Sequence, residues 1–116
     1  ATAATVTSML QSVMDHGTGY PARAGGFTLP AAGKTGTMDE YKDAWFVGYT
    51  DRLVGAVWMG YDDSADKLAA DQDGARVALP LWVRAMRAAE GERPAHDVGG
   101  PAPAGLVRDC WITRSV

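Results

Sequence analysis

The sequence predicts one α+β domain, in which helices pack against an antiparallel sheet in the order helix-strand-strand-strand-helix. Segments 3–16 and 77–91 repeat apolar residues at the three- and four-residue spacing of a helix. Between them, segments 43–50 and 53–61 are rich in valine and aromatic residues, which is typical of strands. A chain of 116 residues is long enough for one hydrophobic core.

The first predicted helix, 3–16, has a single apolar stripe and a clear end. Gly17 follows it as a natural C-terminal cap, and His16 stands at the negative end of the helix dipole. The glycines and the proline of 17–26 then predict a loop. The stripe consists of Val6, Met9, Leu10, Val13 and Met14.

The predicted sheet has three strands. Segment 32–38 has small residues, threonines and no helical stripe, so we expect a strand. Only Asp51 and Arg52 separate the next two segments, which predicts an antiparallel hairpin. Most large aromatic side chains of these strands and of the last helix are expected in the core rather than along a groove. These aromatic residues are Trp45, Phe46, Trp58 and Trp82.

The second predicted helix lies within 77–91 and ends at Gly91, with Pro80 in its first turn or at a kink. Its apolar face carries Leu79, Trp82, Val83 and Met86. The preceding segment, 62–74, is an acidic loop. It does not fit a calcium loop, because Ala69 and Pro80 would occupy ligand positions, so we expect no metal and no cofactor.

Composition excludes several classes of protein. The net charge is −3 and the basic residues are scattered, which argues against nucleic-acid binding. The longest apolar stretch is interrupted at Thr50-Asp51-Arg52, whereas a membrane span needs about 20 apolar residues. Both ends look cut, since the chain opens within a helical pattern and stops within a strand-like one. The single cysteine, Cys110, is expected to be a partly buried thiol.

The Gly-Lys-Thr at 33–35 raises the question of a nucleotide-binding P-loop. That loop requires a first glycine at position 28, which is threonine here. Gly36 follows the Lys-Thr pair, and a β-rich hairpin comes next, whereas the P-loop lysine opens a helix. The sequence therefore argues against nucleotide binding.

Lys34-Thr35-Gly36-Thr37 instead suits a strand that binds a carboxylate and stabilises an oxyanion. The edge of a strand offers backbone N–H groups to a developing negative charge. Gly36 lets a substrate backbone approach, although a strand glycine can also mark a bulge. The Lys34 ammonium adds positive charge, and the hydroxyls of Thr35 and Thr37 can donate hydrogen bonds, although both threonines could also be simple strand formers.

At this point the sequence resembles the C-terminal part of the transpeptidase domain of class A penicillin-binding proteins, over roughly residues 5–90. The resemblance implies a partial serine transpeptidase or β-lactamase-like fold. It assigns residues 1–93 to that domain and leaves 94–116 as a loop and an additional strand-like segment, loosely matched. The matching motifs are GTG at 17–19, AGKTGT at 32–37, KDAWFVGYT at 42–50 and VWMGYDD at 57–63.

The family cross-links peptidoglycan: a serine attacks the D-Ala-D-Ala bond of a stem peptide and passes the acyl group to an amine. β-Lactam antibiotics acylate the same serine. By position, the resemblance implies that Lys34 is the lysine of the third motif and that Thr35 and Thr37 bind the substrate carboxylate. It also implies that the Thr37 backbone N–H is half of the oxyanion hole. The implied location is outside the cytoplasmic membrane, anchored by a segment that is not in this sequence.

Two motifs of the family are missing. The chain has no asparagine, so Ser-x-Asn is absent, and its one Ser-x-x-Lys, Ser64 to Lys67, lies downstream in the acidic loop. We therefore expect a fragment that is inactive alone and needs the missing N-terminal part of the same protein. The alternatives are a catalytically silent interaction module, or a fragment of a serine β-lactamase or D,D-carboxypeptidase.

Overall fold

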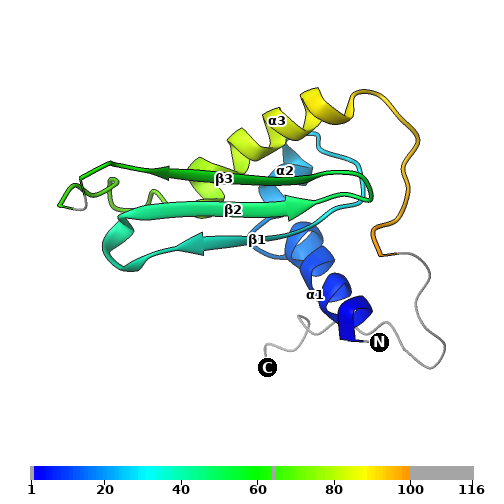
Figure 1. Ribbon diagram of the computed structural model, residues 1–116, viewed down its shortest axis with the longest axis horizontal. Coiled ribbons are helices and arrows are strands. Elements are labelled where there is room, and N and C mark those ends of the chain that lie inside the picture. The colour runs from blue at the N-terminus through cyan, green and yellow to red at the C-terminus, as the bar shows by residue number, and fades with distance from the viewer. Residues whose placement is uncertain (1, 64, 100–116) are drawn as a thin grey trace.

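The structure, a computed structural model, describes residues 2–63 and 65–99. They form a three-stranded antiparallel sheet with helices packed against it, as the sequence predicts (Figure 1). In chain order the elements are α1 (Thr2–His16), α2 (Tyr20–Ala24), β1 (Ala32–Thr37), η1 (Asp39–Tyr41), β2 (Asp43–Tyr49), β3 (Val54–Gly60), η2 (Gly74–Ala78) and α3 (Leu79–Glu90).

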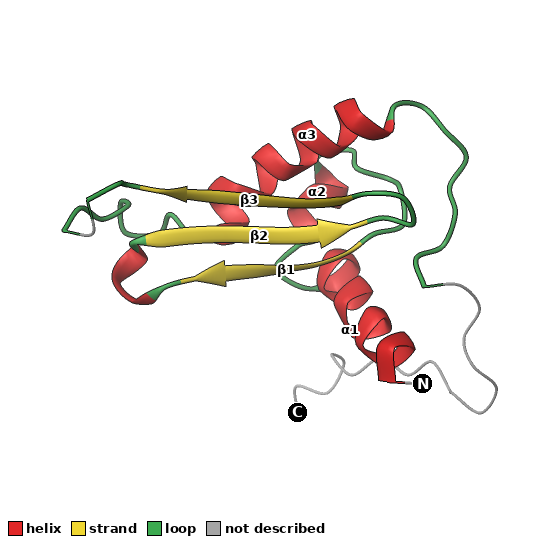
Figure 2. Ribbon diagram, in the orientation of Figure 1, coloured by secondary structure: helices red, strands yellow, loops and turns green. Residues whose placement is uncertain are grey.

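The sheet has the strand order β1-β2-β3, so β2 is central and β1 is an edge. Helix α1 lies beside β1, whereas α3 runs along β3 (Figure 2). None of the helices described between residues 2 and 99 has the length and apolar character needed to cross a membrane. Of the two edge strands, β1 is the one that α1 packs against.

A row of three glycines crosses the sheet and makes room for the core. Gly33 pairs with Gly48, which in turn pairs with Gly55 on β3. A Cβ on Gly48 would lie 2.8 Å from Cζ2 of Trp82, and one on Gly33 would lie 2.7 Å from Cζ of Phe46. The aromatic rings therefore rest directly on backbone, at distances that no side chain on these strand positions would allow.

Trp82 of α3 is the centre of that core. Its ring meets those of Phe27 and Phe46 edge-on, with centroids 5.1 Å apart in each pair. Its indole Nε1 donates to the Gly55 carbonyl at 3.1 Å, so the one polar atom of a fully buried tryptophan has a partner. Met14 of α1 and Leu79 of α3 complete the set of fully buried large side chains.

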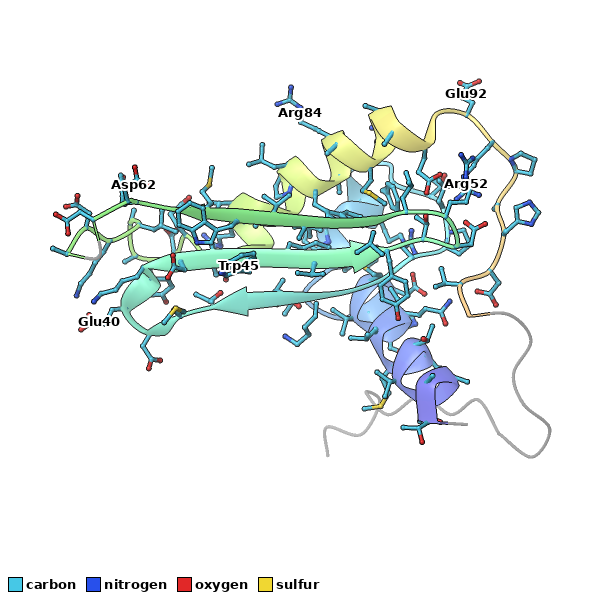
Figure 3. All side chains as sticks on the ribbon, viewed as in Figure 1. Glu40, Trp45, Arg52, Asp62, Arg84 and Glu92 are labelled. Atoms are coloured by element: carbon cyan, nitrogen blue, oxygen red, sulfur yellow. The ribbon has the colours of Figure 1, made fainter. Side chains whose placement is uncertain are left out.

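The expectation that the aromatic residues lie in the core is wrong for the two strand tryptophans. Trp45 and Trp58 remain 41% and 43% exposed, whereas Phe46 is fully buried. Successive side chains of a strand point to opposite faces, so Trp45 lies on the face of β2 opposite Phe46. Figure 3 labels Trp45 on this strand. The two indoles pack on each other there, with centroids 6.5 Å apart.

Of the other local predictions, one needs correction and two are confirmed. The predicted loop 17–26 contains the short helix α2, which begins with Pro21 in its first turn. The hairpin is confirmed: Tyr49 pairs with Val54, and the Thr50 N–H donates to the Leu53 carbonyl at 2.9 Å across Asp51-Arg52. Pro80 lies in the first turn of α3, which continues from the π-helical turn η2. The strand-like segment at the end of the sequence and Cys110 lie outside the described residues.

Candidate functional site

The four residues singled out by sequence, 34–37, all lie on the edge strand β1. They pair with Val47, Phe46, Trp45 and Ala44 of β2, in that order. The start of the strand is buried, and exposure begins at Lys34. No other strand of the described residues pairs with the free edge of β1, and an edge without a strand partner is the kind to which an extended peptide can add.

Gly36 is held in an unbroken ladder. The register runs without interruption from Ala32 to Thr37, so this glycine does not mark a bulge. A Cβ on Gly36 would lie 3.3 Å from Cβ of Trp45, and Gly74 of η2 packs against its backbone from elsewhere in the chain. Because Gly36 has no side chain, Gly74 can pack closely against the backbone of this part of β1.

Both threonine hydroxyls of the strand have partners outside it. Thr35 Oγ1 lies 3.1 Å from Oγ1 of Thr18, in the turn that follows α1. Thr37 Oγ1 accepts a hydrogen bond from the backbone N–H of Gly74 at 3.2 Å. Two elements distant in sequence thus converge on the strand and restrict the rotation of these hydroxyls.

Lys34 supplies the positive charge of the site. Its side chain is exposed, and its ammonium donates to the Thr35 carbonyl at 2.8 Å. None of the ion pairs found in residues 2–63 and 65–99 includes Lys34. An ammonium outside those ion pairs can form a charge-assisted hydrogen bond with a ligand carboxylate.

In the Ser-x-x-Lys of the acidic loop, the lysine has an ionic partner. The Lys67 ammonium is paired with the Glu40 carboxylate at 2.9 Å, and together with Lys42 it lowers the pKa of Glu40. Ser64 lies outside the described residues. Within the described residues no group of three or more His, Cys, Asp or Glu side chains is placed to hold a metal ion.

Sequence reasoning missed the two residues that contact the strand threonines, Thr18 and Gly74. The GTG motif at 17–19 was a visible signal for the first, although its contact with Thr35 spans 17 positions. For Gly74 the signal was Asp73, whose carboxylate accepts from the Arg76 N–H and so begins η2.

Comparison with known proteins finds relatives that match most of this chain. No protein-family model matches the chain. Penicillin-binding protein 1A of Pseudomonas aeruginosa is 44% identical over 100 residues, which cover 86% of this chain and 12% of that protein. Penicillin-binding protein 1A of Aquifex aeolicus is 42% identical over 99 residues, covering 85% of this chain and 13% of the relative.

Among solved structures, penicillin-binding protein 1A from Haemophilus influenzae matches with a TM-score of 0.72 and 28% identity. The match covers 79% of this chain and 15% of that structure. This chain therefore spans about an eighth of the length of the two relatives. The shared sequence and the shared fold show that the chain belongs to the penicillin-binding protein family.

Proposed function

We propose that Lys34, Thr35, Gly36 and Thr37 form the carboxylate-binding and oxyanion-stabilising strand of a serine D,D-transpeptidase. The observation that carries the proposal is the edge strand β1, which among the described residues has a strand partner on one side only. On it lie two hydroxyls and the Lys34 ammonium, which belongs to none of the ion pairs of those residues. The ligands would be a stem peptide ending in D-Ala-D-Ala, and β-lactams, whose carboxylate stands in for that of the terminal D-Ala.

The chemistry assigns each residue of the strand a task. A serine oxygen forms a bond to the carbonyl carbon of the penultimate D-Ala and gives up its proton, and the bond to the terminal D-Ala nitrogen breaks as that nitrogen is protonated. An amine of a second strand then attacks the ester, and the serine recovers a proton. Lys34, Thr35 and Thr37 would hold the terminal carboxylate, while the Thr37 N–H would stabilise the oxyanion of each tetrahedral intermediate.

The nucleophile of this proposal belongs to another part of a longer protein. Support comes from the absence of asparagine, from the pairing of Lys67 with Glu40, and from the small share of each relative that the chain spans. In this proposal the 116 residues alone are inactive, and residues 1–93 are the C-terminal part of a domain that works outside the cytoplasmic membrane.

Fluorescent-penicillin labelling of the full-length gene product tests the role of the strand. Thr37→Val should lower the labelling rate about tenfold or more, because a hydrogen bond to a charged group contributes about 1.5–3 kcal/mol. Thr37→Ser, which keeps the hydroxyl, should label almost as fast as the wild type. Thr28→Val is a matched control, since Thr28 is an exposed threonine in the loop before β1. Equal labelling of Thr37→Val and the wild type would contradict the proposal.

A further inference from the structure

The GTG motif at 17–19 forms a tight turn that presents Thr18 to the edge strand. The N–H groups of Gly17 and Gly19 both donate to the Val13 carbonyl, at 3.1 and 3.0 Å, and so end α1. A Cβ on Gly17 would lie 3.0 Å from Cα of Val13, and one on Gly19 would lie 2.9 Å from Sδ of Met14. A side chain at either flanking position would therefore crowd the end of α1, and the exposed Thr18 lies between these two glycines.

The chemistry of the Thr18–Thr35 pair depends on which hydroxyl donates. The two oxygens are 3.1 Å apart, and either can be the donor. A hydroxyl has one proton and two acceptor lone pairs. When Thr35 donates its proton to a ligand carboxylate, it can keep the bond to Thr18 only as the acceptor. Thr18 must then be the donor, and its proton holds the Thr35 proton toward the ligand.

Thr37, the other threonine of β1, also has a hydrogen-bond partner from outside the strand, and the direction of that hydrogen bond is fixed. A backbone N–H can only donate, so the Gly74 N–H occupies a lone pair of Thr37 Oγ1 and leaves the Thr37 proton free. The two hydroxyls of the strand each have a partner from outside β1. For Thr37 that partner is backbone, and for Thr35 it is the side chain of Thr18.

We propose that Thr18 is a positioning residue for the carboxylate subsite, which donates to Thr35 and orients its proton toward a carboxylate-bearing ligand. This inference rests on the proposed function of residues 34–37. Thr18 itself does not contact the ligand in this proposal. Its effect is therefore expected only with ligands that carry the carboxylate, and only while Thr35 has a hydroxyl to orient.

The test measures the acylation rate constant of the full-length gene product with benzylpenicillin and with its methyl ester. Thr18→Val should lower the rate constant with benzylpenicillin by about three- to tenfold, in keeping with the loss of one neutral hydrogen bond. With the ester the same variant should match the wild type. Thr18→Ser should restore the rate, and in a Thr35→Val background Thr18→Val should have no further effect.

Thr7→Val is the matched control. It removes another hydroxyl–hydroxyl contact, in which Thr7 Oγ1 of α1 lies 3.2 Å from the hydroxyl of Tyr49 on β2, outside residues 34–37. Its rate constants should be those of the wild type. An unchanged rate for Thr18→Val with benzylpenicillin, an equal loss with the ester, or additive losses with Thr35→Val would overturn the inference. If the wild-type protein is not acylated at all, it is the proposed function that fails.

Discussion

The Gly74 backbone N–H donates to the Thr37 hydroxyl at 3.2 Å, which ties the first residue of η2 to the last residue of β1. The Asp73 carboxylate accepts from the Arg76 N–H at 3.0 Å and caps the start of η2. Since η2 continues directly into α3, the helix that carries the core tryptophan also sets the position of the edge strand. Core packing and the candidate site are therefore coupled through one glycine.

Gly74→Ala should disrupt the packing of η2 against β1. The new Cβ would collide with the Trp45 carbonyl oxygen and lie 3.0 Å from the Gly36 carbonyl oxygen, and both of these are backbone atoms. We expect a loss of about 1–3 kcal/mol in the free energy of unfolding, as for other overpacked sites. Thermal unfolding measures the loss, and penicillin labelling should slow in parallel.

Arg76→Ala is the control for this variant. Arg76 belongs to the same turn, and its ion pair with Asp71 is exposed on both sides, so its removal should change stability by less than about 1 kcal/mol. A Gly74→Ala protein that is as stable as Arg76→Ala, and that labels as fast, would contradict the coupling.

The glycine row across the sheet predicts a second effect. Gly48→Ala would place a Cβ 2.8 Å from Cζ2 of Trp82, in a ring that is fully buried and fixed by its bond to Gly55. The ring has no room to move, so we expect a loss of about 1–3 kcal/mol in the free energy of unfolding, measured with chemical denaturant. Val54→Ala, at a position that is 75% exposed, should cost much less. Equal losses in the free energy of unfolding for the two variants would mean that the Trp82 ring does not pack directly on the Gly48 backbone.

The β2–β3 turn and the end of α3 share a charged cluster that predicts acid sensitivity. Glu90, only 6% exposed, accepts from Arg93 Nε at 2.6 Å and from the Thr50 hydroxyl. Arg93 also pairs with Asp51 at 2.5 Å, and Figure 1 shows the turn beside the loop that follows α3. Hydrogen bonding to Arg93 is the largest cause of the lowered pKa of Glu90 and outweighs the opposing effect of burial.

A lowered carboxyl pKa stabilises the folded state above the pKa of the unfolded chain, and this contribution is lost as the pH falls through the folded pKa. The ordinary value for this group is 4.5, so the loss should begin near that pH and continue below it. The unfolding midpoint of the wild type, followed from about pH 7 to pH 3, should therefore fall more steeply than that of Glu90→Gln. Parallel curves for the two proteins would exclude Glu90 as a source of the acid sensitivity.

Local patterns were sufficient to predict most of the fold. Helix α1 and the hairpin follow from apolar periodicity and from strand-forming residues on both sides of a short turn, and both are confirmed. Helix α2 was missed because the four glycines of residues 17–26 outweigh the single proline in its first turn. Strand alternation, visible in the sequence, places Trp45 and Phe46 on opposite faces of the sheet. Which of the two faces is buried depends on the position of α3, which the strand pattern does not specify.

The candidate site was predicted only in part. Lys34 to Thr37 were identified because a lysine, two threonines and a glycine on a strand fit a carboxylate ligand. Their partners Thr18 and Gly74 lie 17 and 37 positions from the residues they contact, and no local pattern specifies such pairs. The roles of all six residues remain predictions for experiment.

The central claim is that this chain supplies the anion-binding strand of a β-lactam-acylated site but not its nucleophile. Intact-mass analysis and peptide mapping of the full-length gene product after incubation with benzylpenicillin test it most directly. We predict one stoichiometric adduct, on a serine outside these 116 residues. An adduct on a serine of this chain, Ser64 included, or no adduct at all, would contradict the account.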